Sequence, residues 1–358
     1  MEGSRFGALD GLRAISVVGV VWHHVSGIHD IPLVNQGYRG VDFFFAISGF
    51  LITTLLLRER RQYGRISLKN FYIRRTLRIF PLYYAVLGMY CLLTAVTMNG
   101  TAKGDAFWGN LPAFATYTSN WFVDLESGDG VTFYFAWSLA TEEQFYLFWP
   151  PLLVLAFWLK GKAWPAVVVA LALVGLQLVA ATSSGDSFPL TVLASLAPAI
   201  LLGSVFAILL THRPSFEVLF GVLGRALASP LLVVVVAALM FVEAPTVVVQ
   251  LAMVLLVVSL CIREDTPLHP ALRLRPLVFI GGISYGMYLL HMLAANAVRR
   301  MLGHEAGIDV FLATLALVTL IAFVSFRYFE SPILKRAQRF RPGPGLREGN
   351  SVRKLPVD

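Results

Sequence analysis

Four polar side chains lie within apolar stretches that are long enough to cross a membrane. His24 lies in the first stretch, Ser48 in the second, Glu142 in the fourth and His291 in the ninth. At about 1.5 Å per helical residue, all four fall roughly 9–12 Å from the predicted outer end of their segments. Polar groups are costly in hydrocarbon, so we expect them to turn inward and meet. A carboxylate can hold one histidine tautomer, so His24 and Glu142 together predict general-base chemistry.

A second group of reactive residues is basic and lies at the opposite end of the predicted segments. Arg74, Arg75 and Arg78 occur in the run NFYIRRTLRIFPLYY, and Arg13 opens the first apolar stretch. Arginine binds phosphate through paired hydrogen bonds, so this cluster predicts an anion site. A long phosphate-bearing thioester such as acyl-coenzyme A could reach from these arginines to the histidine. The positive-inside rule alone would also explain the same arginines.

The elements that must position these residues are membrane-spanning helices. Hydrophobic residues make up 57% of the 358 residues and charged residues 14%, with a mean hydropathy of +0.71. A soluble domain carries about 25% charged residues. The two cysteines, Cys91 and Cys261, have neither metal-site nor disulfide spacing, and we expect no metal. We predict an all-α polytopic membrane protein with about ten spans. The predicted spans cover about residues 12–30, 40–57, 79–98, 134–158, 164–182, 188–210, 229–243, 245–262, 277–298 and 308–329, with an amphipathic surface helix at 215–228.

The charges between the spans set the predicted orientation. The net charge is +8, and the segment 58–78 is strongly basic, whereas the segment 99–133 is acidic. Basic loops usually face the cytoplasm, so we expect ten spans with both termini cytoplasmic. Arg299 and Arg300 fall on the predicted outer side and are the exception to this pattern.

Six blocks of the sequence, in this order, resemble acyltransferase family 3. The members of this family are integral membrane enzymes that O-acylate carbohydrates, lipids and macrolides. The resemblance covers spans one to four and returns in spans nine and ten. The blocks are LDGLRAISVVGVVWHH, GYRGVDFFFAISGFLITTLLL, NFYIRRTLRIFPLYY, WSLATEEQFYLFWP, ISYGMYLLHM and YFESP.

The resemblance implies roles for individual residues. Its pattern of Arg or Lys, ten residues and His falls on Arg13 and His24, which selects His24 over His23. Its arginine-rich block falls on the cluster described above. Its tryptophan motif falls on Trp137, Ser138, Leu139, Glu142 and Tyr146.

The expected reaction is acyl transfer from acyl-coenzyme A, with acetyl-CoA favoured, to a hydroxyl of a carbohydrate or glycolipid acceptor. His24, oriented by Glu142, acts as general base, and an acyl-histidine intermediate stays open. The donor phosphates bind at Arg13, Arg74, Arg75 and Arg78. Supporting roles, which include stabilising the oxyanion, fall to Ser48, Trp137, Ser138, Tyr146, Tyr288 and His291.

We expect residues 1–334 to form a membrane-embedded acyltransferase domain and 335–358 a basic cytoplasmic tail, in the inner or cytoplasmic membrane of a bacterium. Some family members carry an SGNH hydrolase-like domain after the last span, which the tail does not resemble. The membrane domain is therefore expected to complete the transfer or to pass its acyl group to another protein. A proton-coupled transporter, which also buries histidine and glutamate, is the alternative, although no repeated halves are seen. A non-catalytic membrane scaffold is the third possibility, and no nucleic-acid partner is expected.

Overall fold

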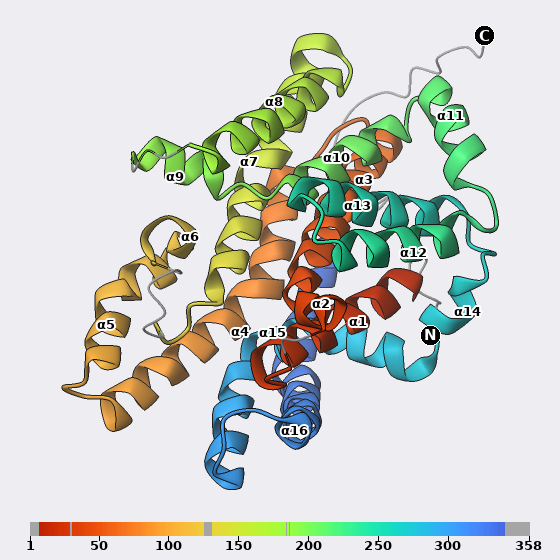
Figure 1. The fold of residues 1–358 in the computed structure, drawn as a ribbon. Coiled ribbons are helices and arrows are strands. Elements are labelled where there is room, and N and C mark those ends of the chain that lie inside the picture. The colour runs from red at the N-terminus through yellow and green to blue at the C-terminus, as the bar shows by residue number, and fades with distance from the viewer. Residues whose placement is uncertain (1–6, 29–30, 125–130, 184, 186, 341–358) are drawn as a thin grey trace.

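The computed structural model describes residues 7–28, 31–124, 131–183, 185 and 187–340. These residues form helices and no strands, so the all-α prediction is confirmed for them (Figure 1). Three predicted features lie outside the described residues. They are the end of the first span at 29–30, the acidic residues Glu126 and Asp129, and residues 341–358 of the tail.

Helices from both ends of the chain surround the site described below. The N-terminal part contributes α1 (Gly7–Val25), α2 (Pro32–Asn35), η1 (Gln36–Arg39), α3 (Gly40–Tyr63), α4 (Leu68–Thr97), α5 (Ala102–Ala115), α6 (Ser119–Phe122) and α7 (Ala136–Lys160). The C-terminal part contributes α15 (Arg275–Leu302), α16 (Ile308–Ser325), the π-helical turn η2 (Phe326–Glu330), α17 (Ser331–Ala337) and η3 (Gln338–Phe340). Between them lie α8 (Trp164–Ala181), α9 (Phe188–Ala194), α10 (Pro198–Leu209), α11 (Arg213–Leu223), α12 (Ala228–Phe241), α13 (Thr246–Ile262) and α14 (Leu268–Leu272).

Within the described residues, five continuous helical stretches are long and apolar enough to cross a membrane. They are Leu33–Tyr63, Leu68–Thr97, Trp164–Ala181, Arg275–Leu302 and Ile308–Phe340. Two bent pairs, α9 with α10 at 55° and α11 with α12 at 76°, would raise the number to seven. The ten spans and the sides of the termini therefore stay predictions.

One predicted span is broken in the structure, and the predicted surface helix is present but ends earlier than expected. The predicted span 188–210 is broken, because α10 begins at Pro198 and a proline cannot continue the hydrogen-bond ladder of the preceding helix. The predicted surface helix at 215–228 is a separate helix, α11, that ends before α12 begins.

Glycine allows close packing at two helix contacts that position the site. Gly281 of α15 lies directly against the backbone carbonyl of Asp10 in α1, and Gly49 of α3 lies against that of Ile200 in α10. A β-carbon at either glycine would collide with the facing backbone. Small residues are the usual means of bringing membrane helices together. The helices that carry His24 and Ser48 are thus held by α15 and α10.

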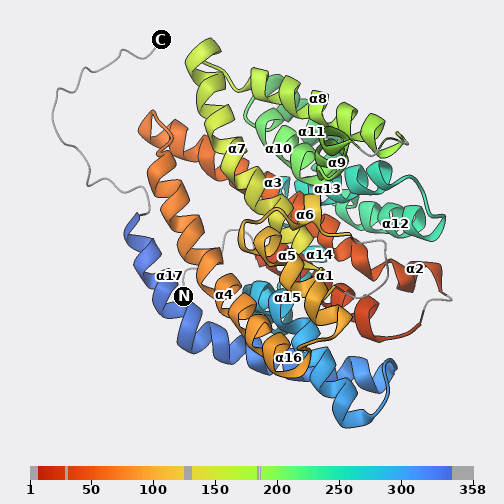
Figure 2. The same cartoon turned by 90° about the vertical axis from the view of Figure 1, so that its left-hand side faces the viewer.

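The C-terminal helix α17 lies beside α4 (Figure 2). Helix α16 continues through the π-helical turn Phe326–Glu330 into α17, which runs through the predicted domain boundary at residue 334. The Arg74 guanidinium donates from Nη1 to the carbonyl oxygen of Phe340 at 2.6 Å. This contact places the C-terminal end of the described chain next to the arginine cluster.

Candidate active site

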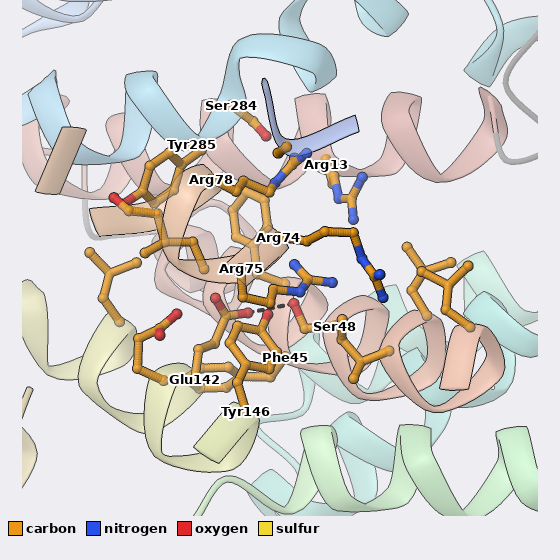
Figure 3. Close-up of a pocket in the computed structure, with 18 of the residues that line it drawn as sticks. Arg13, Phe45, Ser48, Arg74, Arg75, Arg78, Glu142, Tyr146, Ser284 and Tyr285 are labelled. Atoms are coloured by element: carbon orange, nitrogen blue, oxygen red, sulfur yellow. Dashed lines mark hydrogen bonds between the residues drawn. The ribbon is translucent and has the colours of Figure 1, made fainter. Parts of the chain in front are cut away.

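A cavity of about 780 Å³ lies between α1, α3, α4, α7, α15 and α17. Its walls bring together residues that are far apart in the sequence, from Arg13 to Gln338. Nine of the predicted site residues line it: Arg13, Ser48, Arg74, Arg75, Arg78, Ser138, Glu142, Tyr146 and Tyr288. Figure 3 shows the guanidinium groups of the four arginines facing one space, with Glu142 and Tyr146 on the opposite wall.

Two of the four arginines are paired with acidic side chains. Arg13 contacts Asp10 at 3.1 Å. Arg74 contacts the buried carboxylate of Glu59 at 3.3 Å, and Glu59 also accepts from the backbone N–H of Ser67 at 2.8 Å. The charges of Arg13 and Arg74 are therefore partly balanced by the protein itself.

The other two arginines have no such partner. Within the described part of the chain, neither Arg75 nor Arg78 forms a salt bridge. Arg75 is half-buried, and its guanidinium carbon lies 4.9 Å from the ring centre of Tyr146. Glu142 and Glu143 interact with Arg75 electrostatically but form no salt bridge with it within the described chain, so guanidinium N–H groups that face the cavity can bind an anion.

Glu142 is bonded across the cavity wall to α3. Its Oε1 atom accepts a hydrogen bond from the Ser48 hydroxyl at 2.5 Å (Figure 3). No hydrogen bond joins Glu142 to His24 among the described residues, so the expected orientation of His24 by Glu142 is not seen. A shared depth in the bilayer does not fix the direction in which a side chain leaves its helix, and Glu142 points to the arginines instead.

His24 lies outside the cavity, near the C-terminal end of α1. Its Nδ1 atom is 2.8 Å from the carbonyl oxygen of Val20. A carbonyl can only accept, so Nδ1 carries the proton and Nε2 keeps its lone pair. The side chain is half-buried, and Arg299 donates to the His24 carbonyl oxygen at 2.8 Å. Arg299, the exception to the charge pattern, thus caps the end of α1.

A chain of contacts on α15 links His24 to the cavity. The ring of His24 lies 4.9 Å from that of fully buried His291, centre to centre, and His291 lies 5.6 Å from Tyr288. His291 donates from Nδ1 to the Tyr288 carbonyl oxygen at 2.5 Å, and its Nε2 has no partner among the described residues. The Tyr288 hydroxyl is 2.6 Å from the Ser138 hydroxyl. Tyr288 and Ser138 thus form the cavity wall nearest to His24.

The remaining predicted residue, Trp137, does not line the cavity but packs against Phe45, with the ring centres 6.1 Å apart. The polar lining residues that the predicted site leaves out include Glu59, Glu143, Ser284 and Tyr285. Tyr285 lies one turn before Tyr288 in the block ISYGMYLLHM, so helical spacing was the available signal.

A family model for an acyltransferase domain, acyltransferase family 3, matches residues 6–327. The O-acetyltransferase OatA of Staphylococcus aureus strain NCTC 8325 is 28% identical over 368 residues, and a putative O-acetyltransferase, SACOL0978, of strain COL is 29% identical over 371 residues. The matches cover 92% and 93% of this chain but only 57% and 58% of the relatives. The chain therefore spans little more than half the length of these proteins. No solved structure matches significantly.

The matched segment contains all of the cavity-lining helices α1, α3, α4, α7 and α15, whereas α17 lies beyond its end. Together with several apolar helices of membrane-spanning length, it identifies a multi-pass integral membrane protein. The chain belongs to acyltransferase family 3.

Proposed function

We propose that this protein is a membrane O-acetyltransferase that moves an acetyl group from acetyl-coenzyme A to a hydroxyl of a carbohydrate acceptor. The observation that carries the proposal is the cavity in which four guanidinium groups face one space (Figure 3), two of them, Arg75 and Arg78, without a direct salt bridge in the described chain. The printed names of the relatives, O-acetyltransferases, support the acetyl group and the hydroxyl.

The donor binds with its phosphates among the arginines and its thioester towards Ser138 and Tyr288. Phosphate oxygens accept hydrogen bonds from Arg75 and Arg78, in contacts that suit a planar guanidinium. From Arg13 to His24 is eleven residues of helix, roughly 16 Å along the axis. The extended pantetheine arm of coenzyme A is long enough to cover a distance of this order.

The acceptor hydroxyl gives its proton to Nε2 of His24, and its oxygen attacks the thioester carbonyl carbon. The C–O bond forms, the C–S bond breaks, and the leaving thiolate takes the proton from His24. His24 does not line the cavity, so the wall formed by Tyr288 and Ser138 must open for the thioester to reach it. Glu142 balances the arginines and positions Ser48, in place of the role beside His24 that we expected.

A proton-coupled transporter is the alternative, and the two bent helix pairs favour it because transporters use broken helices at their binding sites. The residues that line the cavity, however, come from neither pair. The enzyme proposal accounts for both the arginines and the histidine.

The deciding experiment uses purified protein in lipid nanodiscs with labelled acetyl-CoA, and chitotetraose or water as the acceptor. We expect release of coenzyme A by the wild type and by the control His23→Ala, and none by His24→Ala. A transporter or scaffold would leave acetyl-CoA intact. Wild-type rates from a folded His24→Ala protein would remove His24 from the mechanism.

A further inference from the structure

Glu143 is a cavity-lining residue in which one carboxylate oxygen accepts no hydrogen bond from the described residues. Its Oε1 atom is buried and has no hydrogen-bond partner among the described residues. Its neighbour Glu142, in contrast, accepts from Ser48 at 2.5 Å. Buried polar atoms in folded proteins almost always have a partner, so an exception calls for a physical explanation.

The tyrosines around Glu143 do not supply the missing donor. Tyr83, Tyr84 and Tyr285 all interact with it electrostatically. Their hydroxyls donate instead to the backbone carbonyls of Phe114, Ala115 and Ile79, at 2.8, 2.9 and 2.8 Å respectively. Arg75 also interacts with Glu143 electrostatically, but no hydrogen bond joins the two in the described chain. The remaining sources of a donor are a ligand in the cavity and Tyr117.

Tyr117 and Tyr146 also interact electrostatically with Glu143, and Tyr146 forms its hydrogen bond with Glu142. The Tyr117 hydroxyl is also buried without a partner in the described chain, and Tyr117 does not line the cavity. Its ring is stacked on that of Tyr83, with the centres 4.2 Å apart. Stacking restrains the ring, so we infer that the donor to Glu143 belongs to a ligand in the cavity. The variant Tyr117→Phe in the experiment below tests the other source.

The position of Glu143 on α7 indicates which part of a ligand it meets. Ser138, Glu142 and Tyr146 follow one another at four-residue intervals along the cavity wall, about 6 Å apart. Ser138 contacts Tyr288 at the inner end, and Tyr146 contacts Arg75 at the arginine end. Glu143 lies between these two levels. In acetyl-coenzyme A placed as proposed above, the part of the pantetheine arm next to the thioester lies at this level. The first polar group of this arm, counted from the sulfur, is a secondary amide.

We propose that Glu143 accepts a hydrogen bond from the amide N–H of the donor that lies nearest to the thioester. The proposal rests on the proposed function, because it uses that placement of the donor. The contact would hold the arm in register, so that the thioester carbonyl stops at the wall formed by Ser138 and Tyr288. An acetamido group on an amino-sugar acceptor offers the same N–H chemistry and is the competing source.

The test removes the same hydrogen bond from the ligand and from the protein. Acetyl-CoA is compared with an analogue in which the amide nearest the sulfur is an ester, which lacks only the N–H. The kcat/KM for release of the thiol is measured for the wild type, Glu143→Met and Glu143→Gln, with Glu217→Met as a surface control. We expect the wild type to prefer the amide by roughly two- to tenfold, as for one ordinary hydrogen bond.

Glu143→Met should lose this preference, whereas Glu143→Gln, which keeps a carbonyl acceptor, should retain part of it. If Glu143 has a purely structural role, Glu143→Met should lower kcat/KM equally for both donors and leave the preference unchanged. This result would overturn the proposal. If Glu143→Met keeps the preference for the amide donor but loses a preference for chitotetraose over cellotetraose, Glu143 contacts the acceptor substrate. This result would also overturn the proposal. If the wild type shows no preference and Tyr117→Phe creates one, the tyrosine occupies the Glu143 acceptor and the proposal is overturned. A wild type that releases no coenzyme A overturns the proposed function itself.

Discussion

Arg75 offers the sharpest test of donor binding, because its guanidinium faces the cavity and forms no salt bridge within the described part of the chain. We consider Arg75→Ala together with Arg60→Ala as the matched control. Arg60 lies on α3, is half-buried like Arg75, and has its guanidinium 3.9 Å from the ring centre of Phe157. It does not line the cavity, so the control removes the same charge and a similar aromatic contact without touching the site.

The magnitude follows from the contact that is lost. A hydrogen bond to a charged group contributes about 1.5–3 kcal/mol, which corresponds to roughly a 10- to 150-fold rise in the KM for acetyl-CoA. The phosphates do not take part in bond making, so the substrate and the transition state lose the same interaction. The kcat should therefore change little. Arg78→Ala should behave in the same way but more weakly, because Arg78 is more exposed.

The assay is the initial rate of coenzyme A release at increasing acetyl-CoA concentration, repeated at low and high salt. Salt screens the arginine–phosphate attraction, so it should raise the KM of the wild type more than that of Arg75→Ala. The reasoning is refuted if Arg75→Ala changes only kcat, or if Arg60→Ala raises KM as much.

Two further predictions concern the helix arrangement. Gly281→Ala should lower the midpoint of thermal unfolding and the folded yield, because the added β-carbon meets the backbone of Asp10. Gly282→Ala is the control, because Gly282 faces open space and its substitution should have little effect. Equal midpoints for the two variants would contradict the close packing of α1 and α15. A cysteine at Gln62, in a background without native cysteines, should react with membrane-impermeant reagent only after the cells are opened, because the basic segment 58–78 is predicted to be cytoplasmic; labelling from outside would reverse the topology.

The cavity wall could largely be predicted from sequence because its residues follow helical spacing. Ser138, Glu142 and Tyr146 share one face of α7, and Arg74 and Arg78 share one face of α4. Such patterns fix which side chains leave a helix together. Depth in the bilayer likewise follows from residue counts, which is why several polar groups were expected to meet.

The partners across helices could not be predicted, because they depend on how each helix is rotated about its own axis. Glu142 meets Ser48 and not His24, and the imidazole nearest His24 is that of His291. The approach of Phe340 to Arg74 joins residues at opposite ends of the chain, which no local pattern encodes. The bend at α9–α10 escaped notice because an apolar run shows length but not continuity of the helix.

The central claim is that the cavity holds the donor, with its acyl end against α7 and α15. The most direct measurement is photo-cross-linking in nanodiscs with a coenzyme A thioester of a short diazirine acid, followed by mass spectrometry of the labelled peptides. The account predicts adducts within residues 136–146 and 284–291, which disappear when excess acetyl-CoA competes. Adducts confined to α8–α13, or labelling that acetyl-CoA does not reduce, would contradict it.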